Sequence, residues 1–491
     1  MYHRAVSLIG GRAALEHRRV AIFGAGVEGR GMAALISRSC DELVIVDDAP
    51  DRGPEVLRPS VLTERRFDFV IRSPGVRPDD GRIEAARSLG AVVTSASALF
   101  LEDFVGRTVV GVTGSKGKTT TALLTAAVLG SYGLDVALAG NIGRPVTELY
   151  ADDHHDVFVV ELSSYQTADV TVSPSVGVLT LLAPDHLTFH GSLERYYGDK
   201  LNLFAHHPGL PLAVNACSQE ARRRTATNSG RVLYGCDGAV TTSGGALTIA
   251  GIGEIDLAGF QLRGDHNLAN ACGAVTAARL VTGAPGEPGA LGEALASVAP
   301  PRSRLEPVAS VGRVTFVDDA LASNPEGAMA ALRAYNGEEV VLIAGGGERG
   351  VDFGPLADLI GSLEPPPLVL ALGAAGHSIA GALRSRQPHV ACREIDSLEL
   401  AVAEAWAELS VSGSKRSEDE AVVLFSPGAP TPAEEGSYLD RSRRLRDAVS
   451  LLASSYGPGG RDLARSDATS APDAAPPEPL SPKAPRPEAA R

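Results

Sequence analysis

The sequence lacks several features that would direct the chain away from an aqueous compartment. It has no apolar run long enough to span a bilayer, and its first residues lack a signal-peptide core. Positive charge is also not in surplus, since the formal net charge is −14, which argues against a nucleic-acid or membrane partner. Only five cysteines occur, and their scattered positions predict neither a zinc site nor a disulfide framework. We therefore expect a soluble cytoplasmic protein whose partners are small molecules.

What the sequence does contain is enough apolar surface for several cores. The chain has 491 residues, of which 44% are apolar, so two or three domains are expected. Short apolar runs alternate with helix-favouring stretches, which predicts α/β folding with parallel sheets. We expect a Rossmann-like domain over residues 1–106, a doubly wound central domain over 107–301 and a second Rossmann-like domain over 302–456. Residues 457–491 are rich in proline, alanine and charge, which predicts a disordered tail.

The most informative segment is Thr113–Thr120, which reads Thr-Gly-Ser-Lys-Gly-Lys-Thr-Thr. It lies between an apolar run, Val109–Val112, and a helix-favouring run, Ala122–Leu129. Backbone N–H groups of such a loop bind phosphates, a lysine adds charge and a threonine hydroxyl reaches Mg²⁺. The usual pattern has a glycine where Val112 stands. The predicted ATP-binding residues of this loop are Gly114, Ser115, Lys116, Gly117, Lys118, Thr119 and Thr120.

Polar residues at the ends of neighbouring strands are candidates for the same site. Glu161 ends a buried-looking strand and is placed to hold Mg²⁺, although it could simply belong to a helix N-terminus. His186 follows the next strand, where it could be a ligand or a capping residue. Lys200 on its own reads as an exposed helix lysine. Asn267 and Asn270 share one helix face and could bind a base or satisfy local backbone.

The first domain contains a second glycine-rich turn, Gly24–Gly29, after a strand. A later strand ends in Asp47, and this combination is typical of dinucleotide sites. An NAD-dependent oxidoreductase would explain these residues, but it would leave the phosphate loop, Glu161 and His186 without a role.

Several spaced motifs together resemble the Mur ligases, ATP-dependent enzymes that build the stem peptide of peptidoglycan. The segments that carry the resemblance are Thr113–Thr120, Gly140–Gly143, Glu161–Gln166, Pro184–His186, Asp199–Leu201 and His266–Asn270. The resemblance extends over about residues 18–455. Within the family, the chain is most similar to members that add glutamate to UDP-N-acetylmuramoyl-L-alanine, with a first domain that binds UDP.

The resemblance implies ATP and two Mg²⁺ ions as cofactors and an acyl-phosphate intermediate. It implies catalytic roles for Lys118, Lys200 and His186, with Lys200 carbamylated so that it offers an anionic oxygen to a metal. The implied metal ligands are Thr119, Glu161, His186 and Lys200. Further ATP contacts would come from Asn267, Asn270, Arg304 and Asp319. The muramoyl substrate would meet Gly26, Asp47, Ser73, Gly75, Asn141, Ser163 and Gln166.

The third domain bears on which glutamate is added. Leu321 stands where D-glutamate-adding members have a lysine, and Arg349 stands where another lysine contacts glutamate. An arginine can grip a carboxylate with two parallel hydrogen bonds, which an ammonium does not impose. We expect Ser323, Arg349 and Thr431 to bind glutamate. The resemblance favours L-glutamate, and the D-glutamate-adding enzyme is the alternative.

Two further rivals share part of the pattern. A folate polyglutamylating ligase would have similar middle and last domains but should lack the UDP-type first domain. A catalytically silent nucleotide-binding partner would not need the set of Lys118, Thr119, Glu161, His186 and Lys200. We expect a monomeric enzyme whose third domain swings to complete the ATP site.

Overall fold

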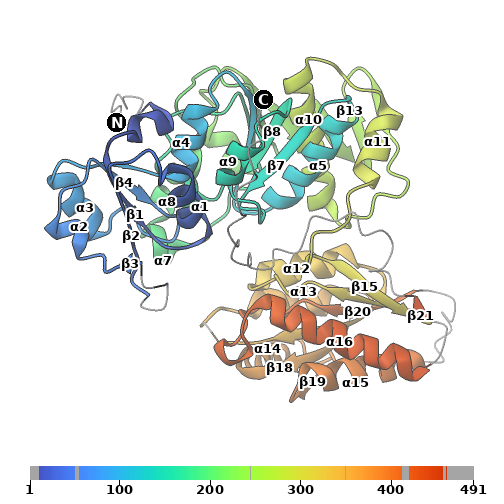
Figure 1. Cartoon of the computed structure of the whole chain (residues 1–491). Helices are drawn as coiled ribbons and strands as arrows, with labels where there is room; N and C mark the ends of the chain where they lie inside the picture. The colour runs from blue at the N-terminus through green and yellow to red at the C-terminus, as the bar shows by residue number, and fades with distance from the viewer. Residues whose placement is uncertain are drawn as a thin grey trace, which may run out of the picture.

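A computed structural model describes residues 10–49, 53, 55–243, 245–348, 350–411, 420–456 and 460–461. Three separate β-sheets organise the described chain, each accompanied by helices, and the α/β fold class expected from the sequence is confirmed. The blue N-terminal part lies beside the central part, and the orange and red C-terminal part lies below both (Figure 1). Among the described residues, none of the helices combines the length and apolar character that a bilayer crossing needs.

The first sheet is fully parallel, with strand order β3-β2-β1-β4-β5. Its strands are β1 (Arg19–Phe23), β2 (Glu42–Val46), β3 (Val56–Leu57), β4 (Phe69–Arg72) and β5 (Val92–Thr94). The accompanying helices are η1 (Gly11–Leu15), α1 (Val27–Ile36), α2 (Val61–Glu64), α3 (Gly81–Ser88) and α4 (Ala96–Asp103). Because the strands are parallel, their carboxyl ends meet at one edge, where a ligand site is expected.

The central sheet has nine strands in the order β14-β13-β12-β11-β10-β9-β6-β8-β7. The parallel strands are β6 (Thr108–Thr113), β7 (Val136–Gly140), β8 (Val157–Glu161), β9 (Val176–Leu179), β10 (Leu212–Asn215), β11 (Arg231–Gly235) and β12 (Val240–Ser243). Strands β13 (Ala246–Ile249) and β14 (Gly253–Ile255) extend it in antiparallel fashion. The helices are α5 (Lys118–Gly130), η2 (Val146–Ala151), α6 (Ser164–Thr167), α7 (Leu187–His190), α8 (Leu193–Leu201), η3 (Asn202–Phe204), α9 (Gln219–Arg224), α10 (Asp265–Thr282) and α11 (Pro288–Ala296).

The third sheet has strand order β19-β18-β17-β20-β16-β15-β21. Its strands are β15 (Glu306–Val311), β16 (Val314–Asp318), β17 (Glu339–Gly345), β18 (Leu368–Leu372), β19 (Cys392–Ile395), β20 (Ala421–Phe425) and β21 (Gly460–Arg461). Its helices are α12 (Pro325–Ala334), α13 (Gly354–Ser362), α14 (Gly373–Arg386), α15 (Leu398–Val411), η4 (Ala433–Glu435) and α16 (Tyr438–Tyr456). The sequence predicts a tail over residues 457–491. Within that range the structure describes only β21, which pairs with β15, and the other residues lie outside the described ones.

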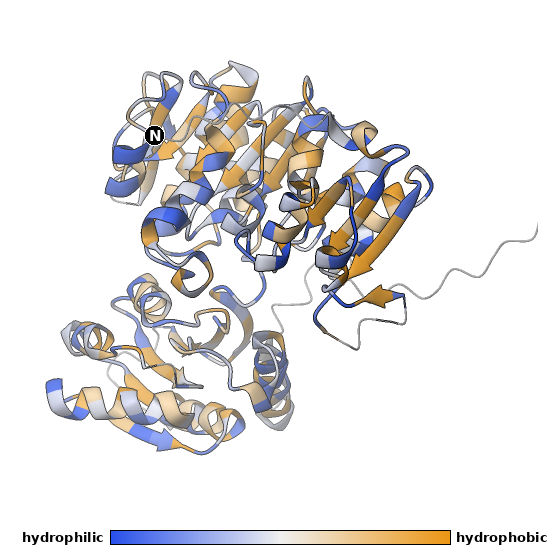
Figure 2. Ribbon diagram, turned by 90° about the vertical axis from the view of Figure 1, so that its left-hand side faces the viewer, coloured by the Kyte–Doolittle hydropathy of each residue, from blue (hydrophilic) through white to orange (hydrophobic). Residues whose placement is uncertain are grey.

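Most of the sheet strands are rich in apolar residues, which Figure 2 shows in orange. All five residues of β8 are buried, because helices cover both faces of a parallel sheet. One apolar cluster runs from Ile22 in β1 to Phe158 in β8 and so joins the first two sheets. The buried residues around the third sheet form clusters of their own. Its core is therefore complete without the rest of the chain, which suits a part that could move as a unit.

Candidate active site

The phosphate-type loop connects β6 to α5 and depends on two glycines. Gly114 has φ +152°, and a Cβ there would lie 1.9 Å from Thr180 Oγ1. Gly117 has φ +87°, and a Cβ there would lie 2.4 Å from Asn270 Oδ1. Both positions therefore exclude any side chain.

Further contacts fix the loop to the segment that follows β9. The backbone N–H of Ser115 donates to Leu181 O at 2.6 Å, and its hydroxyl donates to Ala183 O at 2.8 Å. Lys116 is exposed and pairs with Asp185 at 3.2 Å. Thr119 is half-buried in the first turn of α5, followed by the buried Thr120. These contacts fix the conformation of the loop, so its N–H groups and the helix N-terminus are preorganised, as anion binding requires.

A buried carboxylate lies at the end of the neighbouring strand. Glu161 ends β8 and is 1% exposed. Its Oε1 accepts a hydrogen bond from Asn141 Nδ2 at 3.1 Å, whereas its Oε2 has no hydrogen-bond partner among the described residues. A buried carboxylate oxygen without a donor fits a cation, because such an oxygen is costly unless it is compensated. The strand-end position is as expected, and Glu161 is not part of a helix cap.

Two lysines lie close enough to Glu161 to interact with it electrostatically. Burial lowers the pKa of Lys118, although the Glu161 carboxylate opposes that effect. The Nζ of Lys118 donates to Ser115 O at 3.4 Å. Lys200 is 2% exposed, so the exposed-lysine interpretation of the sequence is wrong. Burial, followed by repulsion from Lys118, holds the pKa of Lys200 well below its usual range.

The neighbour that covers Lys200 was missed from the sequence. Tyr196 lies one turn earlier on α8, with Lys200 Nζ 4.8 Å from its ring centre. Its hydroxyl donates to Ser115 Oγ at 2.9 Å and so links α8 to the phosphate loop. The spacing of four residues, which places both side chains on one helix face, was the available signal.

His186 lies at the N-terminus of α7 and is about half exposed. Its φ of 51° is unusual for a residue with a side chain. Burial lowers the pKa of His186, and repulsion from Lys200 and Lys118 adds to this effect. A neutral imidazole is the form that binds metals, so the residue fits the proposed ligand set.

Asn270 of α10 packs on the phosphate loop at Gly117, and it is hydrogen-bonded to Asn267 of the same helix. Asn270 Nδ2 donates to Asn267 Oδ1 at 3.0 Å, and Thr121 Oγ1 donates to Asn270 Oδ1 at 3.2 Å. Asn267 Nδ2 donates to Arg263 O at 2.8 Å. Both asparagines are therefore bonded to protein groups, and Asn270 lies beside the phosphate loop.

The connection to the third sheet brings Arg304 towards the same loop. Its charge is close enough to lower the pKa of Lys118. Ser303 and Leu305, on either side of it, have φ values of 58° and 48°. Burial raises the pKa of Asp319 to about 7, although the Ser426 hydroxyl at 2.6 Å opposes that rise. Two residues with left-handed backbone therefore flank Arg304, a conformation that costs energy in residues with a side chain.

The predicted UDP residues gather at the carboxyl edge of the first sheet. Asp47 Oδ2 accepts from Ala25 N at 2.7 Å in the glycine-rich turn that contains Gly26. Ser73 Oγ donates to Gly24 O at 2.8 Å. Gly75 follows in an exposed turn, where an added Cβ would meet nothing.

Ser163 and Gln166 form a capping box at the N-terminus of α6. Gln166 Oε1 accepts from Ser163 N at 2.9 Å, and its amide donates to Glu28 of the first domain. Burial raises the pKa of Glu28, which is not among the site residues predicted from the sequence. The Asn141 loop, by contrast, is exposed.

Two of the predicted glutamate residues lie in loops that follow strands of the third sheet. Ser323 is exposed before α12, and Thr431 is half-buried after β20, while Arg349 lies outside the described residues. Arg441 of α16 was missed: it is 2% exposed, and its Nη1 and Nη2 donate to Gly345 O at 3.2 and 3.1 Å. It supports the glycine-rich loop before Arg349.

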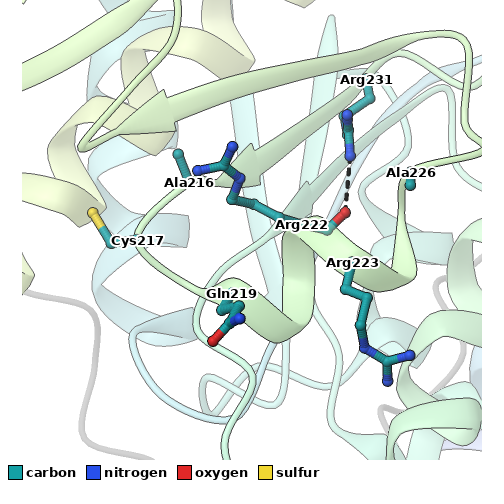
Figure 3. Close-up of a pocket in the computed structure, with 7 residues that line it drawn as sticks. All are labelled: Ala216, Cys217, Gln219, Arg222, Arg223, Ala226 and Arg231. Atoms are coloured by element: carbon teal, nitrogen blue, oxygen red, sulfur yellow. Dashed lines mark hydrogen bonds between the residues drawn. The ribbon is translucent and has the colours of Figure 1, made fainter.

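A separate pocket of about 500 Å³ lies at the carboxyl end of β10 and contains none of the predicted site residues. Figure 3 shows its lining residues: Ala216, Cys217, Gln219, Arg222, Arg223, Ala226 and Arg231. Cys217 forms a disulfide with Cys236, a pairing that the scattered cysteine positions did not predict. The two residues follow β10 and β11, which are parallel neighbours, and sequence spacing does not reveal that proximity.

Comparisons with known proteins agree with this geometry. The Mur ligase middle domain matches residues 112–278. A UDP-N-acetylmuramoyl-L-alanine–L-glutamate ligase from a Micromonospora strain is 36% identical, over 89% of this chain and 97% of that protein. The chain belongs to the Mur ligase family. A UDP-N-acetylmuramoylalanine–D-glutamate ligase from Gloeobacter violaceus is 32% identical, over 89% of this chain and 99% of that protein.

Solved structures show the same fold at low identity. The Thermotoga maritima MurF ligase in complex with ADP has a TM-score of 0.57 and 17% identity, covering 91% of this chain and 98% of that one. The Mycobacterium tuberculosis folylpolyglutamate synthase has a TM-score of 0.52 and 18% identity, covering 73% of this chain and 94% of that one. Mur ligases use ATP with Mg²⁺, and the sequence-based expectation of family is confirmed.

Proposed function

We propose that the protein is an ATP-dependent ligase that adds L-glutamate to UDP-N-acetylmuramoyl-L-alanine in peptidoglycan precursor synthesis. The observation that carries the proposal is the meeting of Lys118, Lys200 and the unpartnered oxygen of Glu161 beside the phosphate loop. Full-length similarity to glutamate-adding ligases supports the substrates. Because ATP is a cytoplasmic metabolite, the proposal includes a cytoplasmic location, and we propose a monomer.

The proposed chemistry begins with an unreactive carboxylate. Transfer of the ATP γ-phosphoryl group to the muramoyl-alanine carboxylate gives an acyl phosphate and ADP. The glutamate amine then attacks the carbonyl carbon, and phosphate leaves as the amide forms. Lys118 and the loop N–H groups would bind the phosphates. Bound Mg²⁺ would neutralise charge on the transferring group.

We propose Thr119 and Glu161 as ligands of one Mg²⁺, and Glu161, His186 and a carbamate on Lys200 as ligands of a second. Carbamylation needs a neutral amine, which attacks CO₂ and loses a proton. The buried position of Lys200 favours that neutral form. Asn267, Asn270, Arg304 and Asp319 would contact ATP.

For the remaining substrates, the proposed muramoyl contacts are Gly26, Asp47, Ser73, Gly75, Asn141, Ser163 and Gln166. Ser323, Arg349 and Thr431 would receive glutamate. The preference for L-glutamate is supported by the relatives that carry that name, and D-glutamate is the second candidate because relatives of similar identity add it.

The test supplies ATP, UDP-N-acetylmuramoyl-L-alanine and each glutamate enantiomer separately. Product from L-glutamate alone is expected. Product from D-glutamate alone overturns the stereochemical proposal, and no product from either overturns the ligase proposal. Lys118→Ala should abolish turnover, whereas Lys116→Ala, in the exposed position of the same loop, should retain much more of it. Lys200→Ala should lose most turnover and regain part of it with small added carboxylates.

A further inference from the structure

One buried histidine joins three elements of the proposed active site. His190 is 2% exposed and is the last residue of α7. Its Nδ1 lies 2.7 Å from Asp199 Oδ2 on α8, and its Nε2 lies 3.0 Å from Ser164 Oγ on α6. Both ring nitrogens therefore have a partner on a different element.

The partners determine which nitrogen carries the proton. A carboxylate only accepts, so Nδ1–H donates to Asp199, and Nε2 accepts from the Ser164 hydroxyl. The ring also stacks on Tyr165 at 5.4 Å between centres with an angle of 12°, and contacts Tyr196 at 5.2 Å. Its orientation is thus fixed on every side by polar and aromatic contacts.

Each partner adjoins a proposed metal ligand. Ser164 lies three residues after Glu161, Asp199 directly precedes Lys200, and His190 itself lies four residues after His186. Ser164 is 1% exposed, so the Ser–His–Asp arrangement is closed to substrate and does not form a nucleophilic site. The structural role of the three residues is therefore to fix the spacing between the elements that carry the proposed metal ligands.

We propose that His190 is a positioning residue, which holds the Glu161 turn and the Lys200 helix so that both side chains face the same cation. This inference rests on the proposed function. Groups that orient metal ligands from behind commonly affect metal affinity or activity by about 10–100-fold when they are removed.

The experiment compares His190→Ala and Ser164→Ala with the wild type. We expect kcat to fall about 10–100-fold in His190→Ala while KM for ATP changes much less, because the hydrogen bonds of His190 go to Ser164 and Asp199 and not to the phosphate loop. Protein equilibrated with carbon-13 bicarbonate should also show a weaker lysine carbamate resonance in His190→Ala, and higher bicarbonate should restore it. A purely structural histidine would lower the amount of folded enzyme without this split.

His206→Ala is the matched control, because His206 is a half-buried histidine of the same domain that takes no part in the proposed site. It should keep kcat and the carbamate resonance. If His190→Ala does not fold, Ser164→Ala decides, since it removes one bond and leaves the ring in place. Unchanged kcat and resonance in the folded variant overturn the inference. A wild type without the resonance, together with an active Lys200→Ala, instead overturns the proposed metal site.

Discussion

Replacing Gly117 by alanine should damage both stability and nucleotide binding through one contact. Gly117 has φ +87°, and its added Cβ would lie 2.4 Å from Asn270 Oδ1. The backbone and the asparagine cannot both keep their positions. Asn270 would have to move away from the loop that it now supports.

The structure sets the size of the effect. A left-handed conformation costs a residue with a Cβ about 1–2 kcal/mol. Displacing Asn270 also removes its hydrogen bonds with Asn267 and Thr121, at 3.0 and 3.2 Å, and each contributes about 0.5–1.5 kcal/mol. We therefore expect a loss of about 2–5 kcal/mol in the free energy of unfolding.

Denaturant unfolding and ATP titration measure the two consequences in the same protein. Gly130→Ala is the matched control, because Gly130 ends the same helix and no atom lies within 4 Å of its added Cβ. It should change stability by less than about 1 kcal/mol and leave ATP affinity intact. If Gly117→Ala proved as stable as Gly130→Ala and bound ATP equally well, the packing of Asn270 against the loop would be refuted.

Two other changes test the buried lysine and the disulfide. In CO₂-free buffer, Lys200→Met should be more stable than the wild type at pH 7, because burial lowers the pKa of Lys200 and the folded wild type must either bury a charge or give up a proton there. Between the two pKa values the folded state binds fewer protons than the unfolded state, so the stability advantage of Lys200→Met should shrink as pH rises towards 10.5. A stability difference that does not depend on pH in unfolding titrations would contradict this prediction. Cys217→Ser should cost the oxidised protein about 3 kcal/mol, because the disulfide closes a loop of 19 residues. Equal unfolding midpoints with and without reductant in the wild type would argue against that bond.

Much of the fold was predictable from local pattern. Strand β1 occupies the apolar run within Arg19–Phe23, and Glu161 ends a strand whose residues are all buried, as the apolar run Val157–Val160 indicates. The phosphate loop followed from the spacing of its glycines and lysine. These features depend on residues that are neighbours in the chain, which is why sequence alone reveals them.

The environment of each site residue was not predictable in the same way. Lys200 reads as an exposed helix lysine, but α8 packs against the phosphate loop through Tyr196 and buries it. The pairing of Cys217 with Cys236 depends on which strands become neighbours, and the support of Gly345 by Arg441 depends on where α16 packs. Such contacts are fixed by tertiary packing, and spacing in the chain carries little information about them.

The charges of the site give a reason why binding of the nucleotide and placement of the third domain should be coupled. The protein is acidic overall, yet four cationic side chains lie at or near the phosphate loop: Lys116, Lys118, Lys200 and Arg304. The positive charges of Arg304 and Lys116 repel that of Lys118. Glu161 and Asp185 offset some of this repulsion, while burial of Lys118 and Lys200 weakens its screening by solvent. A bound polyphosphate would add further negative charge beside these cations. Because Arg304 belongs to the connection with the third domain, the same charge that binds Lys118 also favours the position of that connection. Binding of ATP and placement of the third domain are therefore expected to stabilise each other.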